Sequence, residues 1–340
     1  MKRKDNKYLF NIIFKEKGKG KHMYNLGIDL GGTNIKAGIV DTETGKILIK
    51  DSAPTPVIDG PDAIAEAIAV LCEKVVSGLG IKMQDIASAG IGSPGSCDIE
   101  NGVVIYANNL KLDNFPIGPI LEKRLGLKKV YVENDANVAA KGEAAYGASK
   151  GCRDSVMITL GTGLGGGVIA NGQLVTGVNC AGGELGHITL VVDGLECTCG
   201  RRGCWEVYSS ATGLVKMTQK KMEGTTKADT CMWDVAEKEG KVSARTAFDA
   251  LRMGDKLGKE VVDEFVHYLA EGVISMINIF QPEVFVIGGG VCNEKDYLVK
   301  PLVEYVEKYQ YYHGDKPKTQ IKVAELGNDA GLVGAAMLGL

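Results

Sequence analysis

The sequence predicts an α/β protein of two similar domains, because the strand pattern of the N-terminal region returns in the second half of the chain. Two apolar, β-rich runs, Asn25–Leu30 and Ile35–Val40, flank a first glycine turn. Val156–Leu160 and Val168–Ala170 flank a second glycine turn in the same way. Strands that first form hairpins and then alternate with helices indicate a mixed sheet. We therefore interpret the chain as an internal duplication, with the two domains facing each other across a cleft.

The first half of the chain alternates its further strands with helices. Pro61 suits a first helical turn, and from there to about Val76 apolar residues recur at intervals of three and four. We expect strands at Ile47–Lys50, Ile86–Ile91 and Val130–Val132, and helices at Ile117–Leu125 and from Asn134 to about Tyr146.

The second half continues the alternation and ends in a Gly/Ala-rich helix. We expect a turn at Gly161–Gly167, helices at about Asp255–Phe280, at Tyr297–Lys308 and from Ala330, and strands at Val284–Ile287 and Ile321–Ala324.

A chain of 340 residues exceeds one typical domain. We expect a small N-terminal domain over 23–142, a C-terminal helix over 328–340 that packs back on it, and a large domain over 143–327. Residues 1–22 hold eight Lys/Arg and two Asp/Glu, which makes them a short basic leader. We expect this leader either to be disordered or to precede a true start of translation at Met23.

Composition narrows the functional classes. The formal net charge is −3, so a general nucleic-acid or membrane-surface binder is not expected. No apolar run approaches the roughly 20 residues that span a bilayer. Nine cysteines in a chain without an export signal indicate a reducing compartment. We therefore expect a cytoplasmic protein with no nucleic-acid or membrane partner.

The first glycine turn follows Asp29 and predicts an anion site. Glycines let backbone N–H groups converge on an anion, and Thr33 adds a hydroxyl. Asp29, at the end of the strand, could orient a hydrated Mg²⁺. The alternative is an ordinary hairpin with a capping aspartate, but a second copy of the turn favours a phosphate site.

That second copy begins at Gly161–Thr162–Gly163 and formally matches G-x-G-x-x-G. A dinucleotide site would need a helix directly after the glycines, whereas Val168–Ala170 predicts a hairpin. The P-loop motif G-x-x-x-x-G-K-[ST] is missing from the sequence. The turn therefore resembles the first one and is expected to bind phosphate.

Three cysteines within eight residues, Cys197, Cys199 and Cys204, predict a metal loop over 187–206. With His187 they complete a closed tetrahedral Zn²⁺ site, which leaves no open position for catalysis. The zinc is therefore expected to be structural and to hold Glu184, His187 and Glu206 around the substrate.

Asp135 stands at a strand-to-helix junction within Glu133–Asn137, where a carboxylate can face a ligand. We expect it to take a proton from a sugar hydroxyl while the two glycine turns present the phosphate.

Taken in order, these motifs resemble the ROK family, which comprises repressors, open-reading-frame proteins and kinases. The resemblance rests on Asp29–Thr33, Glu133–Asn137, Gly161–Gly163, Gly183–His187 and the Cys-x-Cys-Gly-x-x-Gly-Cys-x-Glu run ending at Glu206. It covers Met23–Leu340 and is closest to the bacterial glucokinases of the family, helped by Tyr208–Gly213.

The resemblance implies the actin-like ATPase fold of sugar kinases, Hsp70 and actin, with two RNase H-like domains and with ATP and sugar meeting in the cleft. It makes Asp135 the catalytic base, Zn²⁺ a structural ion and Mg²⁺ a cofactor that arrives with ATP. It implies sugar contacts by Ser93, Pro94, Gly95, Asn109, Asn134, Asp135, Glu184, His187 and Glu206. It implies nucleotide and phosphate contacts by Asp29, Gly31, Gly32, Thr33, Asn34, Gly161, Thr162, Gly163, Gly288, Gly289 and Gly290.

Several alternatives remain open. The segment Leu110–Phe115 lacks a Trp associated with the family, so the sugar could be N-acetylmannosamine, allose or fructose rather than glucose. ADP or polyphosphate could replace ATP. A family repressor would need a helix-turn-helix domain of about 60 residues before Asp29, and an actin- or chaperone-like ATPase would need no sugar ligands. We expect a homodimer or homotetramer.

Overall fold

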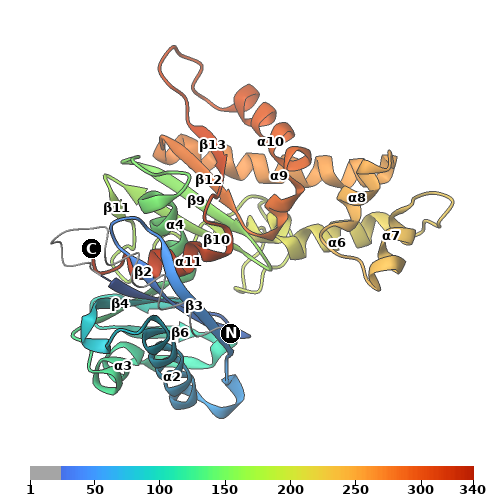
Figure 1. The fold of residues 1–340 in the computed structure, drawn as a ribbon. Helices are drawn as coiled ribbons and strands as arrows, with labels where there is room; N and C mark the ends of the chain where they lie inside the picture. The colour runs from blue at the N-terminus through green and yellow to red at the C-terminus, as the bar shows by residue number, and fades with distance from the viewer. Residues whose placement is uncertain (1–23) are drawn as a thin grey trace. The chain divides into compact units, whose positions relative to one another are not determined.

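The computed structural model describes residues 24–340, which form two compact units (Figure 1). The first unit contains 24–146 together with Thr176–Gly182 and Asn328–Leu340. Gly147–Val175 and Gly183–Gly327 make up the second unit. The basic leader expected over 1–22 lies outside the described residues.

A five-stranded mixed sheet is the centre of the first unit. Its strand order is β3-β2-β1-β4-β8; β1 to β3 are antiparallel, and β4 and β8 run parallel to β1. The strands are β1 Tyr24–Leu30, β2 Asn34–Asp41, β3 Ile47–Pro54, β4 Ile86–Ser93 and β8 Val130–Asn134. The expected hairpins and parallel strands are confirmed.

Helices cover this sheet with their apolar sides. Helix α2 (Pro61–Leu79) buries Ile64, Ile68 and Val75 in the core formed with the sheet. The other helices of the unit are α3 Ile117–Leu125, α4 Asp135–Tyr146 and α11 Ala330–Ala336. Helix α11 lies so close to β1 and β4 that a methyl group on Gly27 or Gly90 would approach a helix carbonyl oxygen to 1.9 or 2.0 Å.

The second unit repeats the sheet. Its order is β11-β10-β9-β12-β13, with the same succession of antiparallel and then parallel pairs. The strands are β9 Ser155–Leu160, β10 Leu164–Ala170, β11 Gln173–Leu174, β12 Val284–Gly288 and β13 Gln320–Val323. Two like sheets in one chain confirm the duplication, and the α/β fold is that of the actin-like ATPases.

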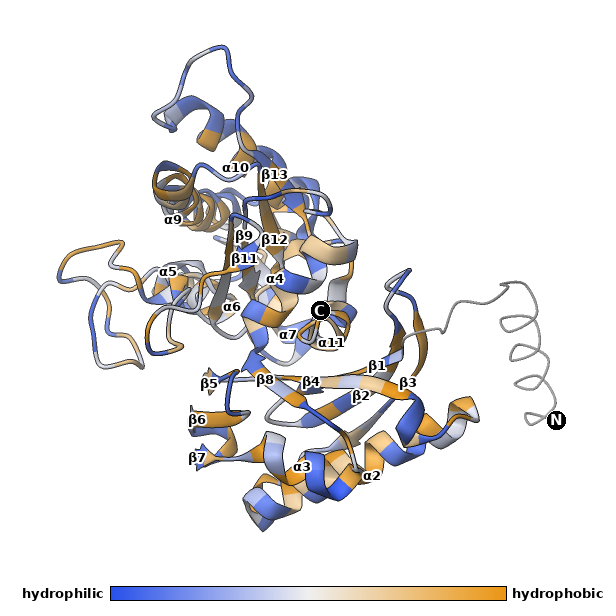
Figure 2. Cartoon of the chain, turned by 90° about the vertical axis from the view of Figure 1, so that its left-hand side faces the viewer, coloured by the Kyte–Doolittle hydropathy of each residue, from blue (hydrophilic) through white to orange (hydrophobic). Residues whose placement is uncertain are grey.

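The core of the second unit packs around the long helix α9 (Lys256–Phe280), which lies alongside α10. Trp205 is fully buried against Gly272 of α9, where a methyl group would meet the indole at 1.9 Å. Figure 2 shows that the strands of both sheets are largely hydrophobic. The further helices are α5 Glu206–Ser209, α6 Ala211–Met222, α7 Met232–Glu239, α8 Thr246–Arg252 and α10 Asp296–Tyr309. Within residues 24–340, no helix has the length and apolar character required to cross a membrane.

Two local features differ from the expectations. The glycines from Gly165 to Gly167 lie inside β10, so the turn is limited to Gly161–Gly163. A small sheet of β5 Ser96–Asp98, β6 Val103–Ala107 and β7 Leu112–Phe115 was not predicted, because its strands are short and separated by polar turns.

Short 3-10 turns occur at η1 Val57–Asp59, η2 Met83–Asp85, η3 Asn108–Leu110, η4 Leu185–His187, η5 Gly290–Glu294 and η6 Gly327–Asp329.

Candidate active site and metal centre

The first glycine turn connects β1 to β2 and is closed by its own backbone. The Gly31 N–H donates to the Asn34 carbonyl at 3.0 Å. Thr55 holds the turn from outside: its hydroxyl donates to the Gly31 carbonyl at 2.6 Å, and its N–H donates to the Thr33 carbonyl at 2.9 Å. Gly32, Thr33 and Asn34 remain exposed, so their polar groups can meet a ligand.

Two side chains lie beside this turn. Asp29 is three-quarters buried and pairs with Lys36 at 2.8 Å. Its carboxyl carbon would be 3.4 Å from a methyl group on Gly331 at the start of α11. Asn109 of η3 lies against Gly32, where an added methyl group would be 3.4 Å from the Asn109 Nδ2 atom. The structure therefore brings Asn109, a residue expected among the sugar contacts, next to the first glycine turn.

The junction between β8 and α4 orders the residues around Asp135. The Asn134 side-chain oxygen accepts from the N–H groups of Ala136 (2.9 Å) and Asn137 (3.2 Å), which caps α4. The Asn134 amide nitrogen donates to the Gly95 carbonyl at 3.0 Å. Asp135 is exposed in the first helical turn, and its Oδ1 accepts from the Ala136 N–H at 2.8 Å.

Ser93 and the loop after it belong to the same cluster. Ser93, the last residue of β4, is in register with Asn134 on β8 and is fully buried. Gly95 lies against the β6 backbone, where a methyl group would be 2.0 Å from the Tyr106 carbonyl oxygen. The first unit thus brings Ser93, Pro94, Gly95, Asn134 and Asp135 together.

Glu133 is a residue for which the sequence suggested no role. It is 1% exposed, and its Oε1 accepts from the Asn134 N–H (2.7 Å) and from the Asn137 side chain (3.1 Å). Burial raises the pKa of its carboxyl group, although these two hydrogen bonds and Lys141 oppose the shift. Burial also lowers the pKa of Lys141. Glu133 therefore fixes Asn134 from the buried side of the junction. In the sequence, the sign of this role is a lone glutamate at the end of an apolar strand, directly before Asn134.

In the second unit, the turn Gly161–Gly163 is bonded to the start of α6. The Gly161 N–H donates to the Gly163 carbonyl at 3.0 Å, which closes the turn. The Ala211 N–H donates to the Gly161 carbonyl at 2.9 Å. The Thr212 hydroxyl donates to the Thr162 carbonyl at 2.6 Å. Because no helix follows these glycines and β10 pairs antiparallel with β9, the rejection of a dinucleotide fingerprint is confirmed.

Glu206 joins the same turn to the metal loop. Its Oε2 accepts from the Leu164 N–H at 2.9 Å, and its Oε1 lies 4.0 Å from the Cys197 sulfur. A methyl group on Gly163 would be 2.3 Å from that Oε2. Glycine at 163 thus leaves the space that the Glu206 carboxylate occupies.

The third glycine run, Gly288–Gly289–Gly290, ends β12 and begins η5. Gly289 has a φ of 90°, and a methyl group there would be 2.5 Å from the Leu160 backbone. Next to Gly290 is a cavity of about 460 Å³ whose walls carry paired charges. Arg252 pairs with Asp249 at 2.7 Å and with the buried Glu294. The other residues that line the cavity are Arg245 and Asn293.

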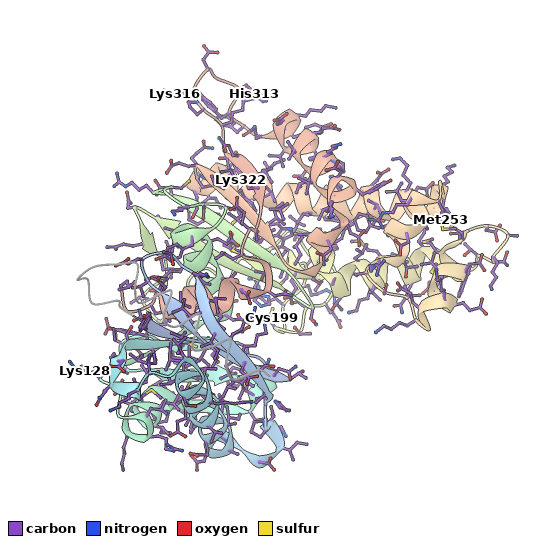
Figure 3. The ribbon with its side chains drawn as sticks, viewed as in Figure 1. Lys128, Cys199, Met253, His313, Lys316 and Lys322 are labelled. Carbon is purple, nitrogen blue, oxygen red and sulfur yellow. The ribbon has the colours of Figure 1, made fainter. Side chains whose placement is uncertain are left out.

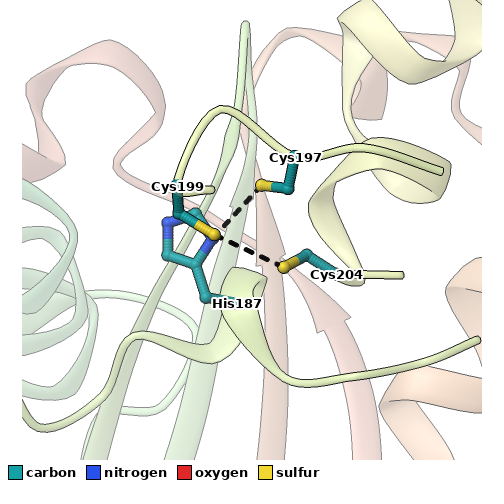
Figure 4. A group of neighbouring side chains, drawn as sticks. All are labelled: His187, Cys197, Cys199 and Cys204. Atoms are coloured by element: carbon teal, nitrogen blue, oxygen red, sulfur yellow. Dashed lines mark hydrogen bonds between the residues drawn. The ribbon is translucent and has the colours of Figure 1, made fainter. Parts of the chain in front are cut away.

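The four expected metal ligands converge in the second unit (Figure 4). The ligand atoms of His187, Cys197, Cys199 and Cys204 all lie within 4.8 Å of one another. The Cys197 sulfur is 3.7 Å from His187 Nδ1, and the Cys199 and Cys204 sulfurs are 3.6 Å apart. Ligands at Zn–S and Zn–N distances in a tetrahedron lie about 3.4–3.8 Å apart, so the cluster has the dimensions of a zinc site.

The chemistry and the backbone of the loop fit a cation as well. Three cysteine sulfurs and one imidazole are the donor set that structural Zn²⁺ sites use. Cys199, which is labelled in Figure 3, is the exposed member of the four candidate ligands. Gly203 has a φ of 77°, and a methyl group there would be 1.6 Å from the Val191 carbonyl oxygen. Glycine is required at 203 for the loop to close.

Glu184 precedes η4, and His187, a member of this cluster, ends it. The His187 N–H donates to the Glu184 carbonyl at 3.1 Å, and the Glu184 residue itself is exposed. Arg201 binds the His187 carbonyl at 3.1 Å. The second unit therefore gathers Glu184, His187 and Glu206 around the metal loop.

Comparisons with known proteins agree with the resemblance. Residues 25–340 match the ROK family. This chain is 38% identical to a glucokinase of Halalkalibacterium halodurans, over 92% of this chain and 94% of that protein. It is 39% identical to a glucokinase of Thermotoga maritima, over 92% of this chain and 96% of that protein. A ROK family glucokinase from Streptomyces griseus, solved in complex with glucose and AMPPNP, has a TM-score of 0.77 and 34% identity, covering 93% of this chain and 98% of that one.

Proposed function

This chain belongs to the ROK family, and we propose that it transfers a phosphoryl group from ATP to glucose with Asp135 as the general base. The observation that carries the proposal is the β8–α4 junction. There an exposed carboxylate, fixed in the first turn of a helix, stands beside Asn134 and Gly95. A carboxylate within reach of a sugar hydroxyl can accept its proton as the phosphoryl group is transferred.

The two glycine turns are proposed to hold the phosphates. Phosphoryl transfer depends mainly on positioning the reactants and neutralising charge. Both turns follow a strand directly and are fixed from outside by hydrogen bonds to their carbonyls. Asp29 provides the carboxylate oxygen that suits Mg²⁺. Asp29 would hold this ion together with the bound ATP, and the ion would supply positive charge that offsets the charge on the phosphates.

Glu184, His187 and Glu206 are proposed as sugar contacts in the second unit. The Nδ1 atom of His187 faces the Cys197 sulfur, which leaves Nε2 for a sugar hydroxyl. The carboxylates of Glu184 and Glu206 supply hydrogen-bond acceptors that suit a polyhydroxylated ligand.

A structural Zn²⁺ is proposed for the cluster of His187 and the three cysteines. Its support is the convergence of four candidate ligand atoms at tetrahedral spacing. Four protein ligands leave no open coordination position, so the ion would stabilise the loop and take no part in the reaction. Metal analysis of the purified protein should give about one zinc per chain.

A nucleotide is proposed as donor because the cavity beside Gly290 has room for a nucleoside. Its volume of about 460 Å³ falls in the range of ligand pockets. Polyphosphate would leave this cavity without an occupant. Gly288–Gly290 would then contact the nucleotide, as the resemblance implies.

The experiment that tests the proposal measures turnover with every pair from a panel of sugars and a panel of donors. The sugars are glucose, N-acetylmannosamine, allose and fructose, and the donors are ATP, ADP and polyphosphate. We expect the highest kcat/KM with glucose and ATP. A higher kcat/KM with another hexose would reassign the substrate, and ATP hydrolysis that is independent of sugar would reject the kinase.

Assembly and location are also part of the proposal. All nine cysteines lie within residues 24–340 and none of them is in a disulfide, which supports a reducing, cytoplasmic setting. The homodimer or homotetramer is supported by the family resemblance, and sedimentation of a single chain would reject it.

A further inference from the structure

The segment from Glu206 to Thr212, here called the clamp segment, makes three hydrogen bonds to the second glycine turn and the residue after it. Ala211 binds the Gly161 carbonyl, Thr212 binds the Thr162 carbonyl, and Glu206 accepts from the Leu164 N–H. The clamp segment begins two residues after Cys204. One short stretch of chain therefore forms a hydrogen bond with each of the three successive peptide groups from Gly161 to Leu164.

The bonds to the turn carbonyls fix the direction of its N–H groups. A trans peptide is planar, and its C=O and N–H point in opposite directions. The Ala211 bond to the Gly161 carbonyl thus orients the Thr162 N–H away from the clamp segment. The Thr212 bond to the Thr162 carbonyl does the same for the Gly163 N–H. These N–H groups are the ones that a phosphate would meet in the turn.

Leu164 contacts residues at or next to both ends of the metal loop. Its N–H donates to Glu206, the residue two positions after Cys204. Its carbonyl oxygen would be 2.2 Å from a methyl group on Gly186, the neighbour of His187. Residues next to the first and the last of the four clustered side chains therefore contact Leu164, the residue at which the turn enters β10.

We propose that Glu206 and Thr212 are positioning residues for the phosphate donor, and that the metal loop sets the geometry of the second glycine turn through them. The inference rests on the proposed kinase function and assigns this loop an effect on the donor in addition to the sugar. Preorganised N–H donors stabilise transferring charge without reorganisation, so a loosened turn lowers kcat and weakens donor binding.

The decisive variant is Thr212→Val, which keeps the shape of the side chain and replaces its hydroxyl with a methyl group that cannot donate a hydrogen bond. Ser210 continues to cap α6 by accepting from the Gly213 N–H at 3.1 Å, so the helix start is preserved. We expect kcat/KM for ATP to fall about 2- to 10-fold, as for loss of one hydrogen bond. Glucose affinity measured without nucleotide should not change, and Thr212→Ser should restore the wild-type values.

The matched control is Thr319→Val. Its hydroxyl donates to the Pro282 carbonyl at 2.7 Å, a bond of the same kind in the same unit. We expect its ATP and glucose constants to equal those of the wild type. Thr212→Val with an unchanged kcat/KM for ATP, or with a loss that Thr212→Ser does not restore, would overturn the inference while leaving the kinase function intact.

A second readout is independent of activity. Hydrogen exchange of the peptide that contains Leu164 should accelerate in Glu206→Ala and after the metal is chelated, and it should stay unchanged in Thr319→Val. Protection that is equal in all these samples would contradict the coupling between the metal loop and the turn. If the wild type phosphorylated no sugar, the proposed function would fail, and this exchange experiment would still decide whether the coupling exists.

Discussion

Three consecutive residues at the end of β8 occupy three different environments. Glu133 is buried, Asn134 caps the helix and binds Gly95, and Asp135 is exposed in the first turn of α4. The sharp change from strand to helix produces this separation, because each residue leaves the sheet in a different direction. Asn134, the neighbour of the proposed base Asp135, is thus supported by a carboxylate that is almost fully buried.

Asp135→Asn should lower kcat by about 10²- to 10⁴-fold, which is the usual contribution of a general base. The asparagine oxygen can still accept from the Ala136 N–H, so the fold and glucose affinity should survive. Steady-state kinetics together with calorimetric glucose binding would check both parts.

Asp62→Asn is the matched control, because Asp62 is an exposed aspartate in the first turn of α2 in the same unit. Its kinetics should equal those of the wild type. Near-normal turnover in Asp135→Asn would remove Asp135 as the base.

Glu133→Gln should flatten the dependence of stability on pH. Burial raises the folded pKa of Glu133 above its ordinary value of 4.5. In the interval between these two pKa values the folded state binds more protons than the unfolded state, so stability falls as pH rises. Glutamine keeps the two hydrogen bonds to Oε1 and has no charge to bury, so the variant should be at least as stable at neutral pH.

Urea unfolding at a series of pH values would measure this effect. Glu100→Gln, at an exposed position of the same unit, is the control. Parallel stability curves for the wild type and Glu133→Gln would contradict the role of burial.

At the scale of elements, the metal loop is the least regular part of the second unit. Between His187 and Cys204 the chain forms isolated bridges and turns, with no regular helix or strand. The conformation of the loop therefore depends on a few contacts. The cluster of His187 and three cysteines is the most concentrated of these contacts.

Cys199→Ala should impair folding and glucose affinity together, because both depend on the same loop. Cys199 is exposed, so its replacement leaves no cavity that would by itself explain a loss of stability. Thermal unfolding, bound zinc and glucose affinity should all decline. Thr198→Ala, at an exposed position in the same loop, is the control. A stable and active protein without metal would refute the structural role.

The docking of α11 on the first sheet depends on glycine at the contact points. A methyl group on Gly90 would overlap the Ala335 carbonyl oxygen at 2.0 Å, and α11 cannot move without disturbing its contact with α4. We expect Gly90→Ala to destabilise the first unit by about 1–3 kcal/mol. Ala87→Ser, at an exposed position of the same strand, should be neutral in the same chemical unfolding experiment.

At the scale of the whole molecule, each unit has its own hydrophobic core. One core surrounds α9 and β9, and the other surrounds β1 and α2. Separate cores predict more than one calorimetric transition. Gly90→Ala should shift one transition and metal chelation another. A single transition that both treatments shift equally would contradict the independence of the cores.

Features that depend on near neighbours along the chain could be predicted from the amino-acid sequence. Strand and helix patterns, the glycine turns and the cysteine spacing are set within a few residues, so they predicted both hairpins, α3 and the cluster of His187 with three cysteines. The short strands β5 to β7 were not predicted, because polar turns between them interrupt the alternation of apolar residues.

Contacts between distant segments were determined by the tertiary structure alone. Three such contacts join parts of the chain that no local pattern connects. Asn109 lies beside Gly32, the Leu164 N–H donates to Glu206, and α11 packs on Gly27 and Gly90. These contacts form because the sheet of each unit brings the ends of strands and helices that are distant in the sequence within hydrogen-bonding distance of one another.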